Sequence, residues 1–348
     1  MTTMLSESAS HLFTAEFKQL SALVQKRIEV EWDYHQRSKD TGIGLPELLV
    51  YADKFGQMLK VVYRYSLLKA FQEEANWYAT TFSARGSGHL LFAALLESWI
   101  VAIEGVIKPP ECNELAAPLQ QLHQELPEII AQNADSIREL NAGPVSPLVA
   151  CLLRGDISGA RDIVSGLVDQ GRSLDRLIID LILPAMAEVG LRWELHTVEI
   201  YQEHLATEAV RSLLVWIAEM KQDVQPSPPT ALISCVPGDE HDLVPLALWA
   251  YLEVRGWSAR NLGKSLPADQ IARAVADLDP DTLFLVQTLL SQLDDALKTI
   301  DLVHTLCGDC QIVVGGRGAE AAREILENAN AIVVNNFDEA CRISERKG

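Results

Sequence analysis

The chain has 348 residues, of which 48% are hydrophobic, and this is enough for two or three compact domains with ordinary cores. Its 29 basic and 48 acidic residues leave a formal net charge of -19. Because a field of that sign repels a phosphate backbone, we predict no direct contact with nucleic acid.

Targeting signals are absent from the pattern of polar and apolar residues. Residues 1–10 are polar and lack the apolar core of a signal peptide. We find no uninterrupted apolar stretch of the length that crosses a bilayer. Six scattered cysteines are typical of free thiols in a cytosolic protein, since disulfide frameworks belong to small secreted domains. The sequence therefore predicts a cytoplasmic protein without a membrane partner.

Residues 1–140 carry apolar side chains three and four positions apart, which predicts an all-α domain. The helical patterns cover residues 13–33, 45–78, 88–107 and 114–132, with breaks at 41–44, 85–88 and Pro109-Pro110. A linker is predicted at 143–147. Helix number and length leave open a globin-like sensor or output fold, by analogy at the level of fold alone.

Residues 146–223 form a second helical region. Its pattern predicts a small four-helix bundle whose helices are separated at Gly155, at 171–173 and at 190–197. Each separator contains glycine or polar residues that favour turns. The length of the region suits a compact cap beside a larger domain.

Helix ends within this region have recognisable signals. Ser173 is expected to cap a helix beginning at Leu174, and Gly190 is expected to end it in the left-handed conformation. Pro184 predicts a bend between them. Thr197 is expected to cap the following helix.

After a proline-rich linker at 225–229 the period of the apolar residues changes. Short apolar runs alternate with helical segments over residues 229–348, which predicts a doubly wound parallel sheet of the flavodoxin-like or Rossmann-like kind. The predicted strands are 231–236, 258–262, 283–286, 312–314 and 331–334. The chain as a whole is thus predicted to be an α and α/β multidomain protein.

Ligands of such sheets bind beyond the carboxyl ends of the strands, so the loops at that edge are the predicted ligand site. Taken singly, a histidine in such a loop is typical of a solvated or capping residue, and a glycine pair is typical of a tight turn. The order of these residues along the chain is more informative than each residue alone. The loops carry Asp239, Glu240 and His241 after the first strand, Thr288 and Leu290 after the third, and Gly315 and Gly316 after the fourth.

This order resembles the cobalamin-binding domain, in which an Asp-x-His-x-x-Gly loop, a Ser/Thr-x-Leu segment and a Gly-Gly pair follow one another. The resemblance implies that His241 is the lower axial cobalt ligand and that Asp239 hydrogen-bonds its other ring nitrogen. It further implies that the nucleotide tail of the cofactor is lined by Thr288, Leu290, Gly315 and Gly316.

One position departs from the motif. Where the family has glycine, this chain has Val244, followed by Pro245. A β-branched side chain there is expected to obstruct the close approach of the tail to the backbone. The departure leaves open a different tetrapyrrole, heme or a bilin, in a remodelled pocket.

Trp193 is followed, after nine residues, by the pair Glu203-His204. This spacing resembles the helical cap of cobalamin-dependent photoreceptors of the CarH type. The resemblance implies that Trp193 packs over the upper axial group of adenosylcobalamin in the dark. Light then removes that group, and His204 of the Glu203-His204 pair becomes the upper axial metal ligand. The two resemblances together cover residues 147–345.

The same residues also have an ordinary interpretation, with Trp193 as a core aromatic and His204 as a surface residue. Helical geometry places His204 on one stripe with Ile200 and Thr207, a mixed surface typical of an interdomain contact. His196 is the nearest competitor of His204 for the upper face. The thiols of 307–310 are interpreted as ordinary cysteines, since no second pair accompanies them.

The predicted N-terminal domain has no basic stripe, whereas CarH-type repressors carry a basic DNA-binding module in front of the cap. We therefore predict a light-sensing signalling protein, not an enzyme, that acts through a protein partner of its N-terminal domain and as a homo-oligomer. Two alternatives stay open. One is a corrinoid methyl carrier of a methyltransferase system, and the other is a heme or bilin sensor with the same fold.

Overall fold

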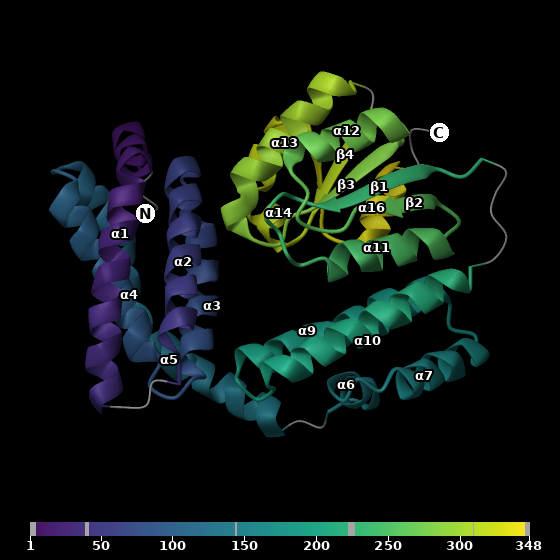
Figure 1. Cartoon of the computed structure of the whole chain (residues 1–348), viewed down its shortest axis with the longest axis horizontal. Helices are drawn as coiled ribbons and strands as arrows, with labels where there is room; N and C mark the ends of the chain where they lie inside the picture. The colour runs from purple at the N-terminus through teal and green to yellow at the C-terminus, as the bar shows by residue number, and fades with distance from the viewer. Residues whose placement is uncertain (1–4, 39–41, 143–144, 222–226, 309, 345–348) are drawn as a thin grey trace. The chain divides into compact units, whose positions relative to one another are not determined.

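The computed structural model describes residues 5–38, 42–142, 145–221, 227–308 and 310–344 (Figure 1). Residue 41 of a predicted break, residues 143–144 and 225–226 of the predicted linkers, and residue 309 between the two thiols lie outside the described residues. The chain divides into two compact units. The first comprises Met1–Pro144 with Arg192–Thr197, and the second comprises Val145–Leu191 with Val198–Gly348.

The first unit is all-α, as predicted. Its helices are α1 (Glu7–Ser38), α2 (Leu45–Tyr65), α3 (Leu68–Ser83), α4 (His89–Val106) and α5 (Glu111–Ala142). The single helix predicted over 45–78 is wrong, because Ser66 adopts a left-handed φ of 55° and ends α2. No glycine or proline marks that break. Helix α5 is longer than predicted, with Pro118 and Pro127 inside it.

Helix α4 is the core helix of this unit and packs against α1 and α5. Among the described helices it is long and apolar enough to cross a membrane by length and composition, which corrects the expectation that no such stretch exists. Half of its length is buried inside the unit, however. Trp99 of α4 is fully buried near Phe13, whose ring lies 4.8 Å from that of Tyr63. The helix therefore has the burial of a core helix.

The second unit begins with the four predicted helical pieces. They are α6 (Pro147–Leu153), α7 (Ile157–Asp169), a continuous run of α8 (Leu174–Leu177), the π-helical η1 (Ile178–Ile182) and α9 (Leu183–Glu194), and finally α10 (Ile200–Glu219). The last three residues of α9 belong to the first unit. The breaks predicted at Gly155 and Gly171 are confirmed, with φ of 67° and 87°. Both values favour glycine because it has no Cβ.

The end of α9 differs from the prediction. Gly190 lies inside the helix, which continues to Glu194, and the left-handed residue is His196 with a φ of 54°. The irregularity expected near Pro184 is the π-helical turn that directly precedes it. A wider turn suits a proline that has no N–H to donate.

The caps of the neighbouring helices are only partly as predicted. Ser173 occupies the N-cap position of α8, but its side chain makes no capping hydrogen bond. Thr197 is not the cap of α10, since its hydroxyl donates to the carbonyl of Arg192 at 3.0 Å. The N-cap is Glu199, whose backbone N–H donates to Oε1 of Gln202 at 3.0 Å.

The rest of the second unit is a five-stranded parallel sheet. Its strands are β1 (Thr230–Cys235), β2 (Ser258–Asn261), β3 (Thr282–Val286), β4 (Gln311–Gly315) and β5 (Ile332–Val334), in the order β2-β1-β3-β4-β5. This is the doubly wound, flavodoxin-like order, so the predicted fold class is confirmed. The order reverses between β1 and β3, and the carboxyl ends of these strands form the switch point.

Helices cover both faces of this sheet (Figure 1). Helices α11 (Leu243–Val254) and α16 (Phe337–Ser344) lie on one face, and α12 (Ala268–Leu278) and α13 (Leu293–Leu306) lie on the other. Helix α10 packs on α11. One apolar core runs from Leu214 of α10 through Tyr251 of α11 to Phe284 of β3. The helical bundle is thereby held against the sheet.

Candidate functional site

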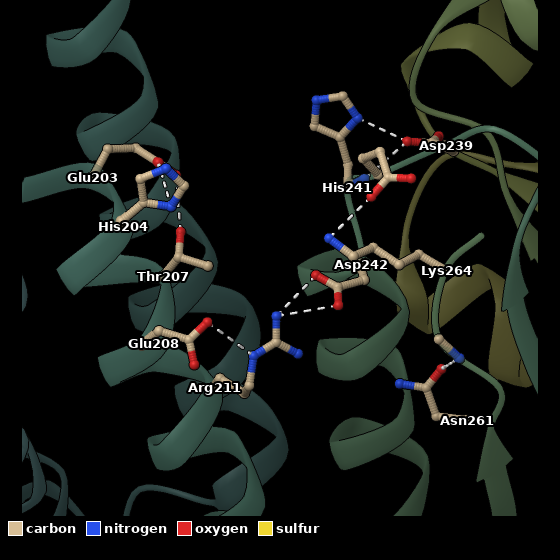
Figure 2. Close-up of polar contacts among 12 residues, drawn as sticks. Glu203, His204, Thr207, Glu208, Arg211, Asp239, His241, Asp242, Asn261 and Lys264 are labelled. Atoms are coloured by element: carbon tan, nitrogen blue, oxygen red, sulfur yellow. Dashed lines mark hydrogen bonds and ion pairs between the residues drawn. The ribbon is translucent and has the colours of Figure 1, made fainter. Parts of the chain in front are cut away.

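The loop after β1 places His241 at the switch point, where Asp239 anchors it (Figure 2). Asp239 is fully buried, and its Oδ1 lies 2.7 Å from Nδ1 of His241 and accepts the backbone N–H of the same residue at 3.0 Å. Its Oδ2 accepts the backbone N–H of Thr288 at 2.7 Å. One carboxylate therefore joins the loops that follow β1 and β3.

The charge of Asp239 decides which ring nitrogen of His241 is available. Burial alone raises the pKa of Asp239, but the hydrogen bonds from His241 and from the backbone of Thr288 outweigh it and lower the pKa below its ordinary value. An ionised carboxylate only accepts, so it favours the tautomer of a neutral His241 that donates from Nδ1 and leaves the lone pair on Nε2. Because half of the His241 side chain is exposed, 51%, this lone pair suits a metal.

Arg211 of α10 fastens the helical bundle to the same loop (Figure 2). Its Nη2 lies 2.9 Å and 3.1 Å from the two carboxylate oxygens of Asp242, the residue after His241. Arg211 follows His204 by seven residues, which is almost two helical turns, so both side chains lie on one face of α10. The face of α10 that carries His204 is thus the face toward the loop of His241.

We expect Arg211→Met to loosen the attachment of α10 without unfolding the unit. Methionine keeps the apolar stem but loses both bonds to Asp242, and such a partly exposed pair contributes about 1 kcal/mol. Urea denaturation of the full chain measures the loss. Arg211→Lys is the matched control, because lysine keeps the charge but loses the paired geometry. Its free energy of unfolding should lie between those of Arg211→Met and the wild type. Equal stability of Met and Arg would contradict the role of the pair.

Glu203 and His204 lie in the first turns of α10. Oε1 of Glu203 accepts the hydroxyl hydrogen of Thr207 at 2.8 Å, and its Oε2 lies 3.9 Å from Nδ1 of His204. The His204 side chain is 72% exposed. Its imidazole is therefore accessible to a ligand, and the Glu203 carboxylate lies near its Nδ1 at a distance longer than a hydrogen bond.

Trp193 is placed in the first unit and not with the other predicted site residues. The guanidinium carbon of Arg85 lies 5.7 Å from the centre of its ring, within the range of a cation–π contact. The second unit holds Glu203, His204 and all the predicted residues of the sheet edge. The structure thus brings His204 and His241 into one unit and gives Trp193 a partner, Arg85, in the turn between α3 and α4 of the first unit.

A groove with a volume of about 780 Å³ also lies in the first unit. It is lined by residues of α3 and α5, among them Lys69, Gln72 and Gln121. None of the residues predicted from the sequence to bind a ligand lines it. The predicted site and this groove are therefore separate features of the chain.

The remaining motif residues differ in how much they can offer a ligand. Thr288 is half-buried, whereas Leu290 is almost fully buried in protein contacts. A Cβ on Gly316 would lie 2.3 Å from the carbonyl oxygen of Gln287, so this glycine makes room for the chain itself. Gly315 has no such neighbour, its nearest contact being 3.5 Å away.

Val244, the residue in place of the motif glycine, lies in the first turn of α11 and is half-buried. It begins the helix that packs on α10. A β-branched residue is tolerated in a first helical turn, and Pro245 behind it suits the same position since no N–H is needed there. Helix formation therefore explains Val244 and Pro245 locally.

Two glutamines at the sheet edge were missed by the sequence reasoning. Gln287 and Gln292 are buried, and the Oε1 atom of each has no hydrogen-bond partner among the described residues. Such orphaned atoms are uncommon in folded proteins and call for a ligand or water. Together with the donor set of His241 and Asp239, they fit a bound corrinoid with a polar tail. Gln287 directly precedes Thr288, and this position beside the motif is the only signal in the sequence that could have indicated it.

Comparison with known proteins bears on the helical bundle and on the sheet domain. Two family models match, both described as B12 binding domain, one over residues 146–217 and the other over residues 229–343. The HTH-type transcriptional repressor CarH of Myxococcus xanthus is 28% identical over 149 residues, which are 42% of this chain and 49% of that protein. The chain thus spans about half the length of this curated relative.

Solved structures of corrinoid and cobalamin-binding proteins are also similar. The monomethylamine corrinoid protein of Methanosarcina barkeri is 16% identical, with a TM-score of 0.47, over 61% of this chain and 99% of its own. A cobalamin-binding protein of Desulfitobacterium hafniense is 19% identical, with a TM-score of 0.32, over 60% and 97%. By the two family matches, which cover the helical bundle and the sheet, the chain carries B12 binding domains in tandem and is a cobalamin-binding protein related to CarH.

Proposed function

We propose that the chain is a light-responsive signalling protein, not an enzyme, that binds adenosylcobalamin between the helical bundle and the sheet. The supporting observation is the position of His204, exposed on the face of α10 whose Arg211 binds Asp242 beside His241. Adenosylcobalamin, when bound, would supply a cobalt that imidazole nitrogens can hold and a light-sensitive cobalt–carbon bond.

Each histidine then has a separate role. His241 would hold the lower face through Nε2, with Asp239 fixing its tautomer and orientation. His204 would bind the upper face only after illumination, with Glu203 as its orienting carboxylate. Because His204 is on α10 and His241 is on the sheet domain, joining both to one ligand would change the packing of α10 on α11.

The test is an absorption measurement on protein loaded with adenosylcobalamin in the dark and then illuminated with green light. We expect a lasting spectral change in the wild type and a different lit spectrum in His204→Ala, which lacks the upper imidazole. His196→Ala is the matched control, since His196 is also exposed and lies eight residues earlier. It should give the wild-type lit spectrum. An unchanged spectrum under light, or a wild-type lit spectrum in His204→Ala, would overturn the proposal.

A methyl carrier of a methyltransferase system is the second candidate, favoured by the exposure of the His204 side chain, 72%. A methyl carrier needs a corrinoid whose upper face its partner enzymes can reach. Methylation of bound cob(I)alamin by a methyl donor system, together with no effect of His204→Ala, would favour this candidate. The same absorption spectra test for heme or a bilin, which would show a Soret or a red band without corrinoid peaks.

The output of the proposed sensor would be a contact between proteins. The net charge of -19 disfavours nucleic acid, so we propose a protein partner for the N-terminal unit and a homo-oligomer in the cytoplasm. The relative CarH is named as a transcriptional repressor. In this chain an acidic helical unit precedes the cobalamin domains, and a change of protein contacts is the response that suits it.

A further inference from the structure

The segment Arg192–Thr197 has an unusual place in the chain. Its first three residues end α9, yet the segment belongs to the first compact unit, whereas the earlier part of α9 belongs to the second. It contains Trp193, the residue that the CarH resemblance assigns to the upper face. The N-terminal helices therefore contact the very segment that would respond to the cofactor.

The contact is polar and directed. Nε1 of Trp77, in α3, donates to Oε1 of Glu194 at 2.6 Å. Nη1 of Arg85 lies 3.5 Å from the carbonyl oxygen of Glu194, and its guanidinium carbon lies 5.7 Å from the Trp193 ring. A hydrogen bond to a charged carboxylate is among the stronger ones in proteins. Both side-chain and backbone atoms of the segment are thus held.

Arg85 is the fixed centre of this contact. Its side chain is only 4% exposed, and a buried guanidinium must be paired and hydrogen-bonded. It donates to the carbonyl of Thr81 at 2.6 Å, lies 3.6 Å from Glu47, and faces the Tyr51 ring at 6.0 Å. The group that meets Trp193 is therefore preorganised by helices α2 and α3.

The backbone of Arg85 is also fixed by a glycine. Gly42 has a φ of 62°, and a Cβ there would lie 2.8 Å from the carbonyl oxygen of Arg85. The turn is closed by the N–H of Gly88, which donates to the same oxygen at 3.0 Å. Together with Glu47, Tyr51 and Trp77, Arg85 forms what we call the Arg85 receptor.

The segment itself is a tight turn with its own hydrogen bonds. The N–H groups of His196 and Thr197 donate to the carbonyls of Trp193 and Arg192 at 3.0 Å and 2.9 Å. His196 holds a left-handed φ of 54°, a conformation that non-glycine residues adopt at a cost.

We propose that the Arg85 receptor binds the segment Arg192–Thr197 and that the N-terminal unit senses the state of the cobalamin domains through it. This proposal rests on the proposed function for the role of Trp193. Any movement of Trp193 that follows a change at the cofactor alters the bonds of Glu194 to Trp77 and Arg85. By linkage, docking of the segment changes the affinity of the cobalamin domains for the cofactor. The bound cofactor changes the docking equilibrium by the same factor.

Hydrogen exchange of the full chain without cofactor tests the docking alone. In Trp77→Phe, which keeps the ring but loses the donor, we expect the amides of residues 192–197 to exchange at least about tenfold faster. Trp249→Phe is the matched control, because Nε1 of Trp249 donates to the carbonyl of Ala259 at 3.2 Å in the sheet domain. It should leave this segment unchanged. Equal exchange in Trp77→Phe and the wild type would overturn the docking.

Glu194→Gln keeps the test valid if Trp77→Phe destabilises the whole unit. It should raise exchange of the same amides, and the double variant should equal Trp77→Phe, since both act through one bond. Titration with adenosylcobalamin in the dark then tests the linkage. We expect Kd to change several-fold in Trp77→Phe and not in Trp249→Phe. Faster exchange with an unchanged Kd would overturn the linkage, whereas no binding by the wild type would overturn the proposed function instead.

Discussion

Asp239→Asn should weaken cobalamin binding about 10- to 100-fold, the range found when the partner of a metal-bound histidine is removed. Oδ1 of Asp239 meets two donors on His241, and Oδ2 meets the N–H of Thr288. An asparagine has one accepting oxygen and one donating NH₂. In either orientation of the amide, its NH₂ group would face an N–H donor, either on His241 or on the backbone of Thr288. One of these two contacts would therefore be lost. Titration with hydroxocobalamin measures the loss.

Asp242→Asn is the matched control for this effect. It changes a carboxylate three residues away, which is partly exposed and bonded to Arg211 and not to His241. We expect its Kd to change much less than tenfold, because partly exposed ion pairs contribute about 1 kcal/mol or less. Equal losses in the two variants would mean that charge at this edge, and not the orientation of His241, decides binding.

The sheet was predictable because each buried parallel strand reads as a continuous apolar run. Leu283–Val286 and Ile312–Val314 fall inside β3 and β4 as observed. Alternation with helices then restricts the topology to doubly wound orders. The described helices of the N-terminal unit were less accurately predicted, because Ser66 breaks a helical pattern without a glycine or proline to mark it.

Local signals failed where tertiary contacts decide the conformation. Gly190 has the residue type of a helix end, but α9 continues to Glu194, whose carboxylate and carbonyl meet Trp77 and Arg85. These partners lie more than one hundred residues earlier in the chain. No window of sequence contains both sides of that contact, so neither the helix end nor the neighbour of Trp193 was predictable.

In the candidate site, too, local contacts were predictable from the sequence and long-range contacts were not. Asp239 and His241 are two residues apart in sequence, and their hydrogen bond follows from the motif that suggested it. Arg211 is 31 residues from Asp242, and its role appears only once α10 is packed on α11. The Oε1 atoms of Gln287 and Gln292, which have no hydrogen-bond partner among the described residues, likewise became visible only when their burial was known.

Gly316→Ala should cost the sheet domain about 3 kcal/mol or more of its free energy of unfolding. Gly316 has φ 115° and ψ 165°, a region that is essentially restricted to glycine and costs about 1–3 kcal/mol for other residues. The added Cβ would also lie 2.3 Å from the carbonyl oxygen of Gln287, a backbone atom that cannot rotate away. The loop that presents Thr288 to Asp239 would have to move, so cobalamin affinity should fall as well.

Gly315→Ala is the control that the motif itself provides. The nearest contact of a Cβ at Gly315 is Cγ2 of Val334 at 3.5 Å, and its backbone lies outside the left-handed region, so we expect a cost below about 1 kcal/mol. Urea denaturation of the full chain, fitted with one transition for each unit, compares the two variants. Equal costs would contradict the distinction.

The two glycines are equivalent in the sequence motif, where either is expected to make room for the nucleotide tail. The structure separates them: Gly316 makes room for the backbone of Gln287, so of the pair we expect Gly315 to be the one that faces a ligand. Gly315→Ala should therefore lower cobalamin affinity while leaving stability nearly unchanged. Gly316→Ala should lower both together, because there the loss of binding follows from the displaced loop. Normal cobalamin binding by Gly315→Ala would show that the nucleotide tail does not lie against Gly315.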